Sequence, residues 1–274
     1  MIGLRQIQMI GGFMARRLWF HLFALVVLTM SLPTGVRAAD PPKTLPTVEE
    51  WTQGLEKHDG LLTLHFDRQR GRAYLELPEA SDPDQGHRYL YVEGLVTGLG
   101  SNDVGLDRGQ LGPARLVGLR RVGGRVLVEE VNLGYRALSD DVDELRAVRQ
   151  SFARSVLWGG EIVAENGDGT VLVDLTSFLV RDAHGTARRL ERAGQGSFSL
   201  DAARSAVRMD ECLVFPENVE LEALLTFKGA KPGIYVRETA PSPEAVTLVQ
   251  HHSLIKLPDD GYRPREFDPR AGSF

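Results

Sequence analysis

Short apolar runs alternate with turns rich in glycine and asparagine over most of the chain. This alternation predicts β-hairpins, because glycine readily adopts the positive φ angles that tight turns require. The predicted strand pairs are 61–66 with 72–77 around Gly71, 115–121 with 125–133 around Gly123-Gly124, and 161–165 with 170–175 around residues 166–169. A further apolar strand is predicted at 89–96. The clearest two-residue period lies at 219–227, where one face should be buried.

Helical patterns are few. The apolar residues that recur at helical spacing are Val142, Leu145, Val148 and Phe152. Ser139 and Asp140 can cap the N-terminus of this helix, and a weaker helix is predicted at 48–57. Many hairpins with one or two helices predict a mainly β, antiparallel fold, sandwich-like or a meander, with an α+β fold as the alternative.

Residues 1–38 have the pattern of a secretory signal peptide. Three arginines precede an apolar run at 18–32, no acidic residue occurs before Asp40, and the small residues that follow predict cleavage between Ala38 and Ala39. The 15 residues of the run would form a helix of only about 22 Å, short of the ~30 Å hydrocarbon core, which favours a cleaved signal over a membrane anchor. We therefore expect an exported protein, periplasmic or extracellular, with a proline-rich linker at 39–47 and no membrane attachment after cleavage.

The charge of the chain argues against one class of partner. The sequence has 32 Lys+Arg and 37 Asp+Glu, a formal charge of −5, and removal of the four arginines of residues 1–38 leaves −9. Contacts to phosphates require a basic surface, so we expect no nucleic-acid partner. The short pairs Arg120-Arg121 and Arg188-Arg189 are interpreted as solvated strand ends and turns.

The motifs of common hydrolases are absent from the sequence. It contains neither His-Glu-x-x-His, which binds zinc on one helical face, nor the Gly-x-Ser-x-Gly elbow. The single cysteine, Cys212, excludes an intrachain disulfide and a multi-cysteine zinc site, and is interpreted as a small buried hydrophobic side chain. His251 and His252 are adjacent in a predicted strand, so their side chains should point to opposite faces, one buried and hydrogen-bonded and the other exposed to solvent.

The densest polar stretch lies at 99–110. Its candidate site residues are Asn102, Asp103, Asp107 and Arg108. These side chains could form a network that orders a long loop, or a contact surface for another domain. We favour the structural role, because buried Asp–Arg pairs of this kind are commonly structural.

Five segments carry a resemblance to a known family. They are 98–110 (GLGSNDVGLDRGQ), 150–159 (QSFARSVLWG), 173–179 (VDLTSFL), 215–220 (FPENVE) and 251–262 (HHSLIKLPDDGY). Together they resemble the N-terminal region of bacterial exported zinc-dependent metalloproteases, in which a β-rich domain of unknown function precedes the catalytic domain. The stretch 265–274 resembles the segment that leads into the catalytic half, so Asp268 and Arg270 are candidates for interdomain contacts.

The resemblance implies a non-catalytic role. In that family, zinc and the catalytic residues belong to a downstream His-Glu-x-x-His helix. We therefore expect no catalytic residue, metal ligand or cofactor in this chain, and no peptide hydrolysis by the chain on its own. The resemblance implies a β-rich accessory domain at 48–258 and a tail at 259–274. Such a truncated or fragment member would support folding or packing of a protease domain, in cis or in trans.

Two other interpretations remain open. The domain could keep a protease latent by offering the Cys212 thiolate to zinc, although Asp210 and Glu211, beside it in a predicted strand, disfavour the thiolate. The chain could also be a free-standing exported β module that binds a protein or a glycan through its hairpin loops.

Overall fold

The computed structural model describes residues 44–259 and 261–263. The chain divides into two units, Met1–Thr44 and Leu45–Phe274, and every element described here belongs to the second. Four residues that the sequence analysis singled out lie outside the described part: Ala38, Ala39, Asp268 and Arg270.

Strands dominate the described residues. The strands are β1 (Glu56–His58), β2 (Thr63–Asp67), β3 (Arg72–Leu77), β4 (His87–Leu95), β5 (Arg115–Val122), β6 (Arg125–Glu130), β7 (Ser155–Glu165), β8 (Val171–Asp174), β9 (Ser197–Leu200), β10 (Ala206–Val207), β11 (Leu213–Val214), β12 (Asn218–Ala230) and β13 (Ala245–Lys256). The helices are α2 (Val48–Thr52), α3 (Val142–Ser151), α4 (Thr176–Leu179), α5 (Thr186–Arg192) and α6 (Ile234–Thr239), with 3₁₀ turns η1 (Ala202–Arg204) and η2 (Met209–Glu211).

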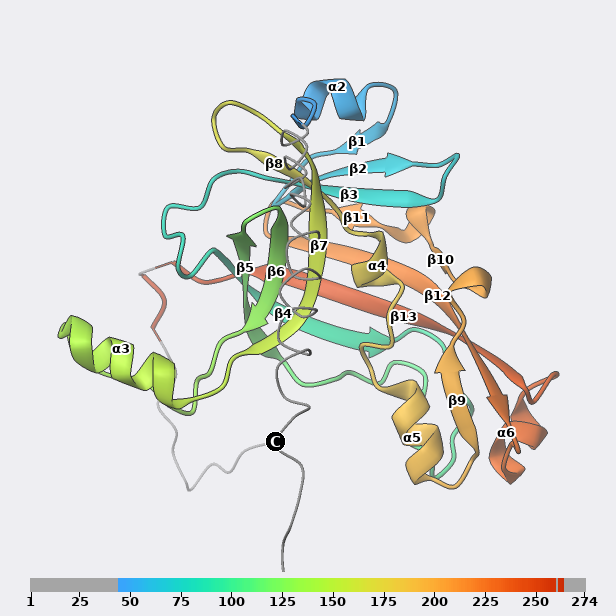
Figure 1. Ribbon diagram of the computed structural model, residues 1–274. Coiled ribbons are helices and arrows are strands. Elements are labelled where there is room, and N and C mark those ends of the chain that lie inside the picture. Colours follow the sequence, from blue (N-terminus) through green and yellow to red (C-terminus); the bar gives the residue numbers. More distant parts are fainter. Residues whose placement is uncertain (1–43, 260, 264–274) are drawn as a thin grey trace, which may run out of the picture. The chain divides into compact units, whose positions relative to one another are not determined.

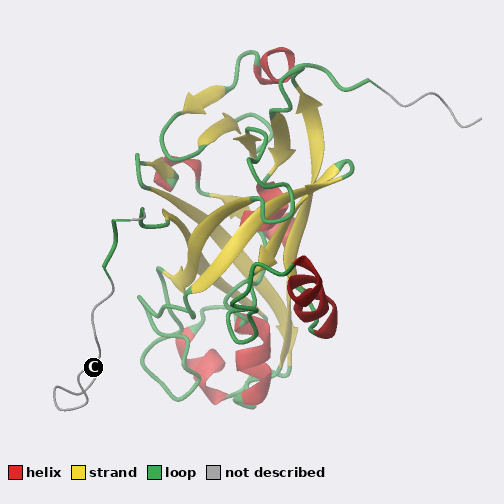
Figure 2. Cartoon of the chain, turned by 90° about the vertical axis from the view of Figure 1, so that its left-hand side faces the viewer, coloured by secondary structure: helices red, strands yellow, loops and turns green. Residues whose placement is uncertain are grey.

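All strands belong to one antiparallel sheet. Its order is β1-β2-β3-β8-β7-β6-β5-β4-β13-β12-β10, and β9 and β11 also pair with β12. Strands β4 to β8 follow one another as a meander, and the sheet curves until its two ends nearly meet (Figures 1 and 2). Across these ends, the Leu61 N–H donates to the Phe215 carbonyl at 2.7 Å, and Arg68 pairs with Asp210 at 2.7 Å. The prediction of a mainly β, antiparallel fold is confirmed.

The inner face of β12 supplies much of the main core. Its alternate residues are at most 1% exposed, as the two-residue period predicts: Val219, Leu221, Ala223, Leu225 and Phe227. Thr226, on the opposite face, is also buried, because η1 covers it and its hydroxyl donates to the Arg204 carbonyl at 2.7 Å. A smaller apolar cluster lies beside α2 and contains Val48, Tyr74, Ala164 and Leu172.

Two predicted hairpins are confirmed by their turn geometry. Gly71 has φ +67° and closes the turn between the paired residues Asp67 and Arg72. Gly123 has φ +57° and lies in the two-residue turn that joins β5 to β6. Positive φ angles of this kind strain residues that carry a Cβ, which explains glycine at both positions.

Several local predictions were wrong. The helix predicted at 48–57 ends at Thr52, because Gly54 takes φ +83° and β1 begins at Glu56. Arg188 and Arg189 lie in α5 rather than in a turn. The N-cap of α3 is Asp141, whose carboxylate accepts the N–H groups of residues 143 and 144.

Cys212 is buried as predicted, but it does not lie in a strand. It directly follows η2 and precedes β11, and its side chain is fully buried. Burial raises the pKa of the thiol to about 11.

Within the described residues, no helix is long and apolar enough to cross a membrane.

The two faces of β12 predict different costs of truncation. Leu225→Ala should lower the free energy of unfolding by about 2–5 kcal/mol, because the side chain is 1% exposed and its loss leaves a cavity. Leu224→Ala, next in the same strand but 37% exposed, should cost no more than about 1 kcal/mol. Urea unfolding of both variants measures the difference, and equal losses would contradict the assigned faces.

Candidate functional site

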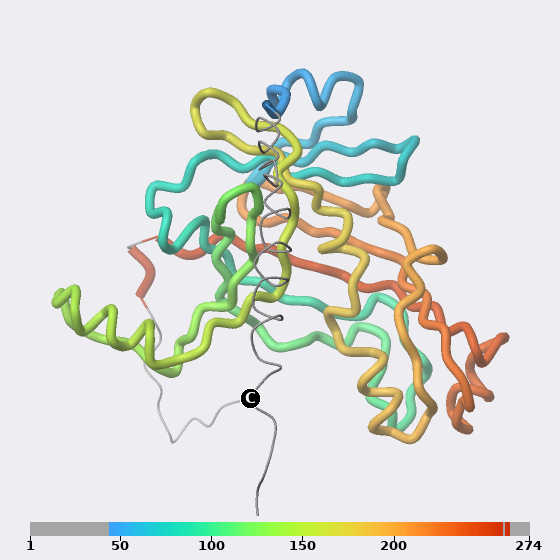
Figure 3. The backbone as a smooth tube through the Cα atoms, viewed as in Figure 1, coloured from blue at the N-terminus to red at the C-terminus, as the bar shows by residue number. Residues whose placement is uncertain are grey.

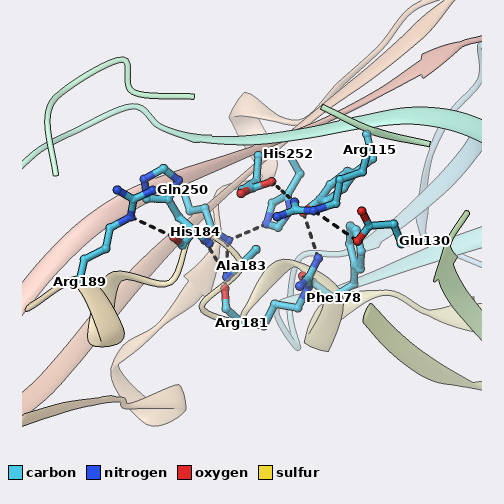
Figure 4. Close-up of polar contacts among 11 residues, drawn as sticks. Arg115, Glu130, Phe178, Arg181, Ala183, His184, Arg189, Gln250 and His252 are labelled. Carbon is cyan, nitrogen blue, oxygen red and sulfur yellow. Dashed lines mark hydrogen bonds and ion pairs between the residues drawn. The ribbon is translucent and has the colours of Figure 1, made fainter. Parts of the chain in front are cut away.

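A polar cluster lies inside the curved sheet, where strands otherwise present apolar side chains (Figure 4). Strands β4 and β13 pair so that Glu93 lies opposite His252. Because alternate residues of a strand share a face, Tyr91 lies on the same face as Glu93, and Gln250 on the same face as His252. Arg181 follows α4 and lies in no strand; its guanidinium contacts this group through the Tyr91 hydroxyl.

Gln250 fixes the orientation of the cluster. Its Oε1 accepts the backbone N–H groups of Ala183 and His184, both at 3.0 Å. Its Nε2 therefore donates, to the Arg181 carbonyl at 2.9 Å and to His252 Nε2 at 2.9 Å. These bonds tie the segment between α4 and α5 to β13.

His252 forms hydrogen bonds through both ring nitrogens. Nδ1 bonds the Tyr91 hydroxyl at 2.9 Å, and Nε2 lies 2.9 Å from Gln250 Nε2 and 3.3 Å from the Leu179 carbonyl. His252 is fully buried, and this burial, with the nearby Arg181 guanidinium, lowers its pKa to about 3. Burial also raises the pKa of Tyr91 to about 12. Both groups are therefore neutral at neutral pH and are not poised to exchange protons.

Arg181 carries its charge without a carboxylate partner among the described residues. Its Nη2 donates to the Tyr91 hydroxyl at 3.0 Å and its Nε to the Phe178 carbonyl at 3.1 Å. The guanidinium lies 4.6 Å from the centre of the Phe178 ring, a cation–π geometry. Burial lowers the pKa of Arg181, so these contacts offset a desolvated charge.

An ion pair between β4 and β5 also belongs to the cluster. Glu93, only 2% exposed, accepts from Arg115 Nη1 at 2.6 Å, and Arg115 also approaches Glu130 at 3.6 Å. His184 is buried nearby, and neither of its ring nitrogens has a hydrogen-bond partner among the described residues. Among those residues, no group of three or more His, Cys, Asp or Glu side chains is placed to hold a metal ion.

The four candidate residues of the 99–110 loop do not form one network. Asn102 donates to the Leu99 carbonyl and accepts from the Val104 N–H, both at 3.0 Å, so it orders its own turn. Asp103 accepts from the Tyr235 hydroxyl of α6 at 3.2 Å. Asp107 and Arg108 form no ion pair in the described part of the chain.

Apolar anchors order this loop instead. Leu99, Val104 and Leu106 are at most 6% exposed and join the main core. Burial of these three apolar side chains, and not the expected Asp–Arg pair, therefore holds the loop in place. The sequence pattern did not predict this.

The connection between β6 and β7, here called the β6–β7 arm (residues 131–154), projects from the sheet (Figures 1 and 3). It contains α3, of which no residue is buried. The apolar side chains exposed on the arm are Leu133, Tyr135, Leu138, Val142 and Phe152. Tyr135 and Phe152 stack with ring centres 3.8 Å apart, and Arg149 and Arg154 pair with Asp84 and Glu129 at the base.

The histidine prediction is confirmed for the opposite faces and for the buried His252, whereas the rest of the cluster was missed. The His251 side chain is only 30% exposed, and it is hydrogen-bonded to Glu220 on the other face. Glu93 could have been predicted as a buried polar residue, because it places a carboxylate inside the apolar strand predicted at 89–96. Arg115, Arg181 and Gln250 had no such signal, because their positions depend on strand pairing between distant segments.

The two histidines should affect stability with opposite signs. His252 stays neutral in the folded state, so below pH ~6.5 the unfolded state binds the additional proton and stability falls, by about 2 kcal/mol between pH 7 and pH 5. His251 has a raised pKa because it hydrogen-bonds Glu220, so its contribution is complete below pH ~6.5 and is lost as pH rises through the raised value.

Urea unfolding from pH 5 to pH 8 tests this assignment. His252→Gln should flatten the loss of stability toward acid pH, although the variant is less stable overall. His251→Gln should make the acid loss steeper. Parallel pH profiles for the wild type and His252→Gln would contradict the buried neutral imidazole.

Comparison with known proteins gives one match. A family described as "Domain of unknown function (DUF5117)" matches residues 109–274, more than half of the chain. The matched region contains β5 to β13 and the β6–β7 arm, whereas Tyr91 and Glu93 precede it. No curated protein and no solved structure was found to match the chain. The expected resemblance to a β-rich domain of unknown function is thus confirmed in this coarser form: the chain belongs to the DUF5117 family.

Proposed function

We propose that this chain is a non-catalytic accessory domain of an exported zinc-dependent metalloprotease, and that it packs against the protease domain through the β6–β7 arm. The protease domain, in cis or in trans, would supply the zinc and the catalytic residues. The motif resemblance of segments such as 98–110 and 251–262 supports the choice of partner. The arm supports the mode of association.

The observation that carries the proposal is the group of apolar side chains on the arm that remain exposed among the described residues. Leu138 is 92% exposed and Val142 63%, and both lie in one segment with Leu133 and Tyr135. Single exposed apolar residues are ordinary, but four of them within ten residues of a projecting segment indicate an interaction surface. A partner that covered this surface would remove it from water at a gain of about 25 cal/mol per Å².

The charges of the arm fit the rim of such an interface. Asp141, Asp143 and Glu144 lie at the start of α3, and Arg146 and Arg149 follow toward its end. Mixed charges around an apolar centre orient a partner and restrict association with other proteins. Arg149 pairs with Asp84 in the connection between β3 and β4, and Arg154 pairs with Glu129 of β6. Both ion pairs restrain the base of the arm, which limits the conformational entropy lost on binding.

Photo-crosslinking in the native host tests the partner. A photoreactive phenylalanine analogue at Leu138 should form an adduct with a polypeptide segment that belongs to a His-Glu-x-x-His protease domain. The same substitution at Ile234 of α6, an apolar helical residue that is 53% exposed, is the matched control and should not form that adduct. Adducts that contain only unrelated polypeptides or glycan would favour the free-standing β module and overturn the proposal.

A charge introduced into the arm should separate binding from folding. Val142→Asp should change the free energy of unfolding by no more than about 0.5 kcal/mol, because the side chain is 63% exposed. In the same variant, the yield of the Leu138 adduct with the protease domain should fall at least about tenfold, because a buried unpaired carboxylate is costly at an interface. An unchanged yield would show that the arm is not the contact surface.

A further inference from the structure

A second surface feature lies far along the chain from the arm, beside the short helix α2. It is a cavity of about 650 Å³ on the outer face of β3, β8 and β7. Tyr74, Leu55 and Val163 form an apolar floor, and Trp51 of α2 forms one wall. This volume falls in the ~300–1,000 Å³ range of sites that bind small ligands.

Local hydrogen bonds hold Trp51 in place although α2 has only five residues. Thr47 and Glu50 form a reciprocal capping box, with bonds of 3.2 and 2.9 Å. Asn166, in the β7–β8 turn, accepts the Val48 N–H at 2.8 Å. Trp51 meets Tyr74 edge to face at 6.1 Å and remains 39% exposed, so an aromatic surface faces the cavity in a fixed position.

The rim of the cavity carries paired charges. Arg70 Nη1 donates to Asp67 at 2.8 Å, and Arg72 Nη1 donates to Asp174 at 2.9 Å. The Arg70 side chain is 78% exposed and that of Arg72 50%, and the Nε and Nη2 groups of both have no hydrogen-bond partner among the described residues. The rim therefore offers hydrogen-bond donors and acceptors, with Glu50 as a further acceptor, but little net charge.

We propose that this cavity binds a neutral oligosaccharide. A sugar ring presents C–H groups on its faces and hydroxyls around its edge, and each hydroxyl both donates and accepts. The C–H face would lie against Trp51, which combines an apolar body with a polar edge, and the hydroxyls would meet the guanidinium and carboxylate groups of the rim. Because each guanidinium is already neutralised by a carboxylate, the rim does not select an ionic ligand.

The sheet beneath the cavity argues against an extended peptide as the ligand. β3 is paired with β2 and with β8, and β8 is paired with β3 and with β7. No strand edge is therefore free at this place for a peptide to add as a further strand. The inference does not depend on the proposed role of the arm, because the two surfaces share no residue.

Calorimetric titration of the full-length protein tests the proposal, with cellohexaose, chitohexaose and xylohexaose as separate probes. At least one should bind with Kd below about 1 mM. Trp51→Ala should weaken that binding at least about tenfold, because aromatic anchors dominate such sites. Tyr262→Ala, which removes an exposed aromatic side chain outside the cavity lining, is the matched control and should leave the Kd unchanged.

A second variant guards against loss of folding. Arg70→Ala should weaken the same binding at least about threefold while near-UV circular dichroism keeps its wild-type shape, because the buried Asp67 carboxylate retains the backbone N–H groups of residues 69 and 70 as donors. The proposal is overturned if none of the three probes binds, if Trp51→Ala binds as the wild type does, or if only charged polymers such as polygalacturonate bind.

Discussion

The pairing of β12 with β13 is the constraint on which the rest of the structure depends. Their register runs without interruption from the Asn218–Ile255 pair to the Lys228–Ala245 pair. β12 supplies the alternating apolar face that forms the centre of the core, and β13 carries Gln250 and His252 to the position opposite β4. Because a shift of one residue would exchange the two faces of each strand, the apolar core and the polar cluster can exist only together.

The polar cluster connects this pair of strands to segments that have little regular structure. Gln250 binds three backbone groups between Arg181 and His184, and Arg181 in turn binds Tyr91. A buried polar network of this kind is stable only when its members are satisfied, and removal of one partner costs more than the bond itself contributes. We therefore interpret Gln250 as the residue that places α4 and α5 on the sheet.

Periodic patterns predicted the sheet well because burial repeats every second residue in its strands. The 219–227 segment and the Gly71 and Gly123 turns are of this kind. The helices α4, α5 and α6 were missed because they are too short for a helical period to emerge. One local signal for α5 existed: Asp182, three residues before the N-cap Gly185, accepts the N–H groups of Thr186 and Ala187, which the first turn of a helix leaves without an intrahelical acceptor.

Site residues were harder to predict, because a polar side chain acquires its role from partners distant in sequence. Asp107 and Arg108 are neighbours in the chain but do not pair, whereas Glu93 and Arg115 belong to different strands and do. The α3 helix was predicted from its apolar period, but that period does not show whether another surface covers its apolar side chains. The exposure of the arm and the cavity beside α2 could not be predicted, because both depend on how strands distant in sequence pair.

The burial of Cys212 has a consequence for handling the protein outside a reducing compartment. The side chain is fully buried, and its thiol, with a pKa of about 11, is protonated at neutral pH. Since only the thiolate attacks disulfides and alkylating reagents, the folded chain resists covalent dimerisation in an oxidising environment. Modification by such reagents would require the region between η2 and β12 to open. The rate at which this one thiol is labelled would therefore report on local unfolding where the two ends of the sheet nearly meet.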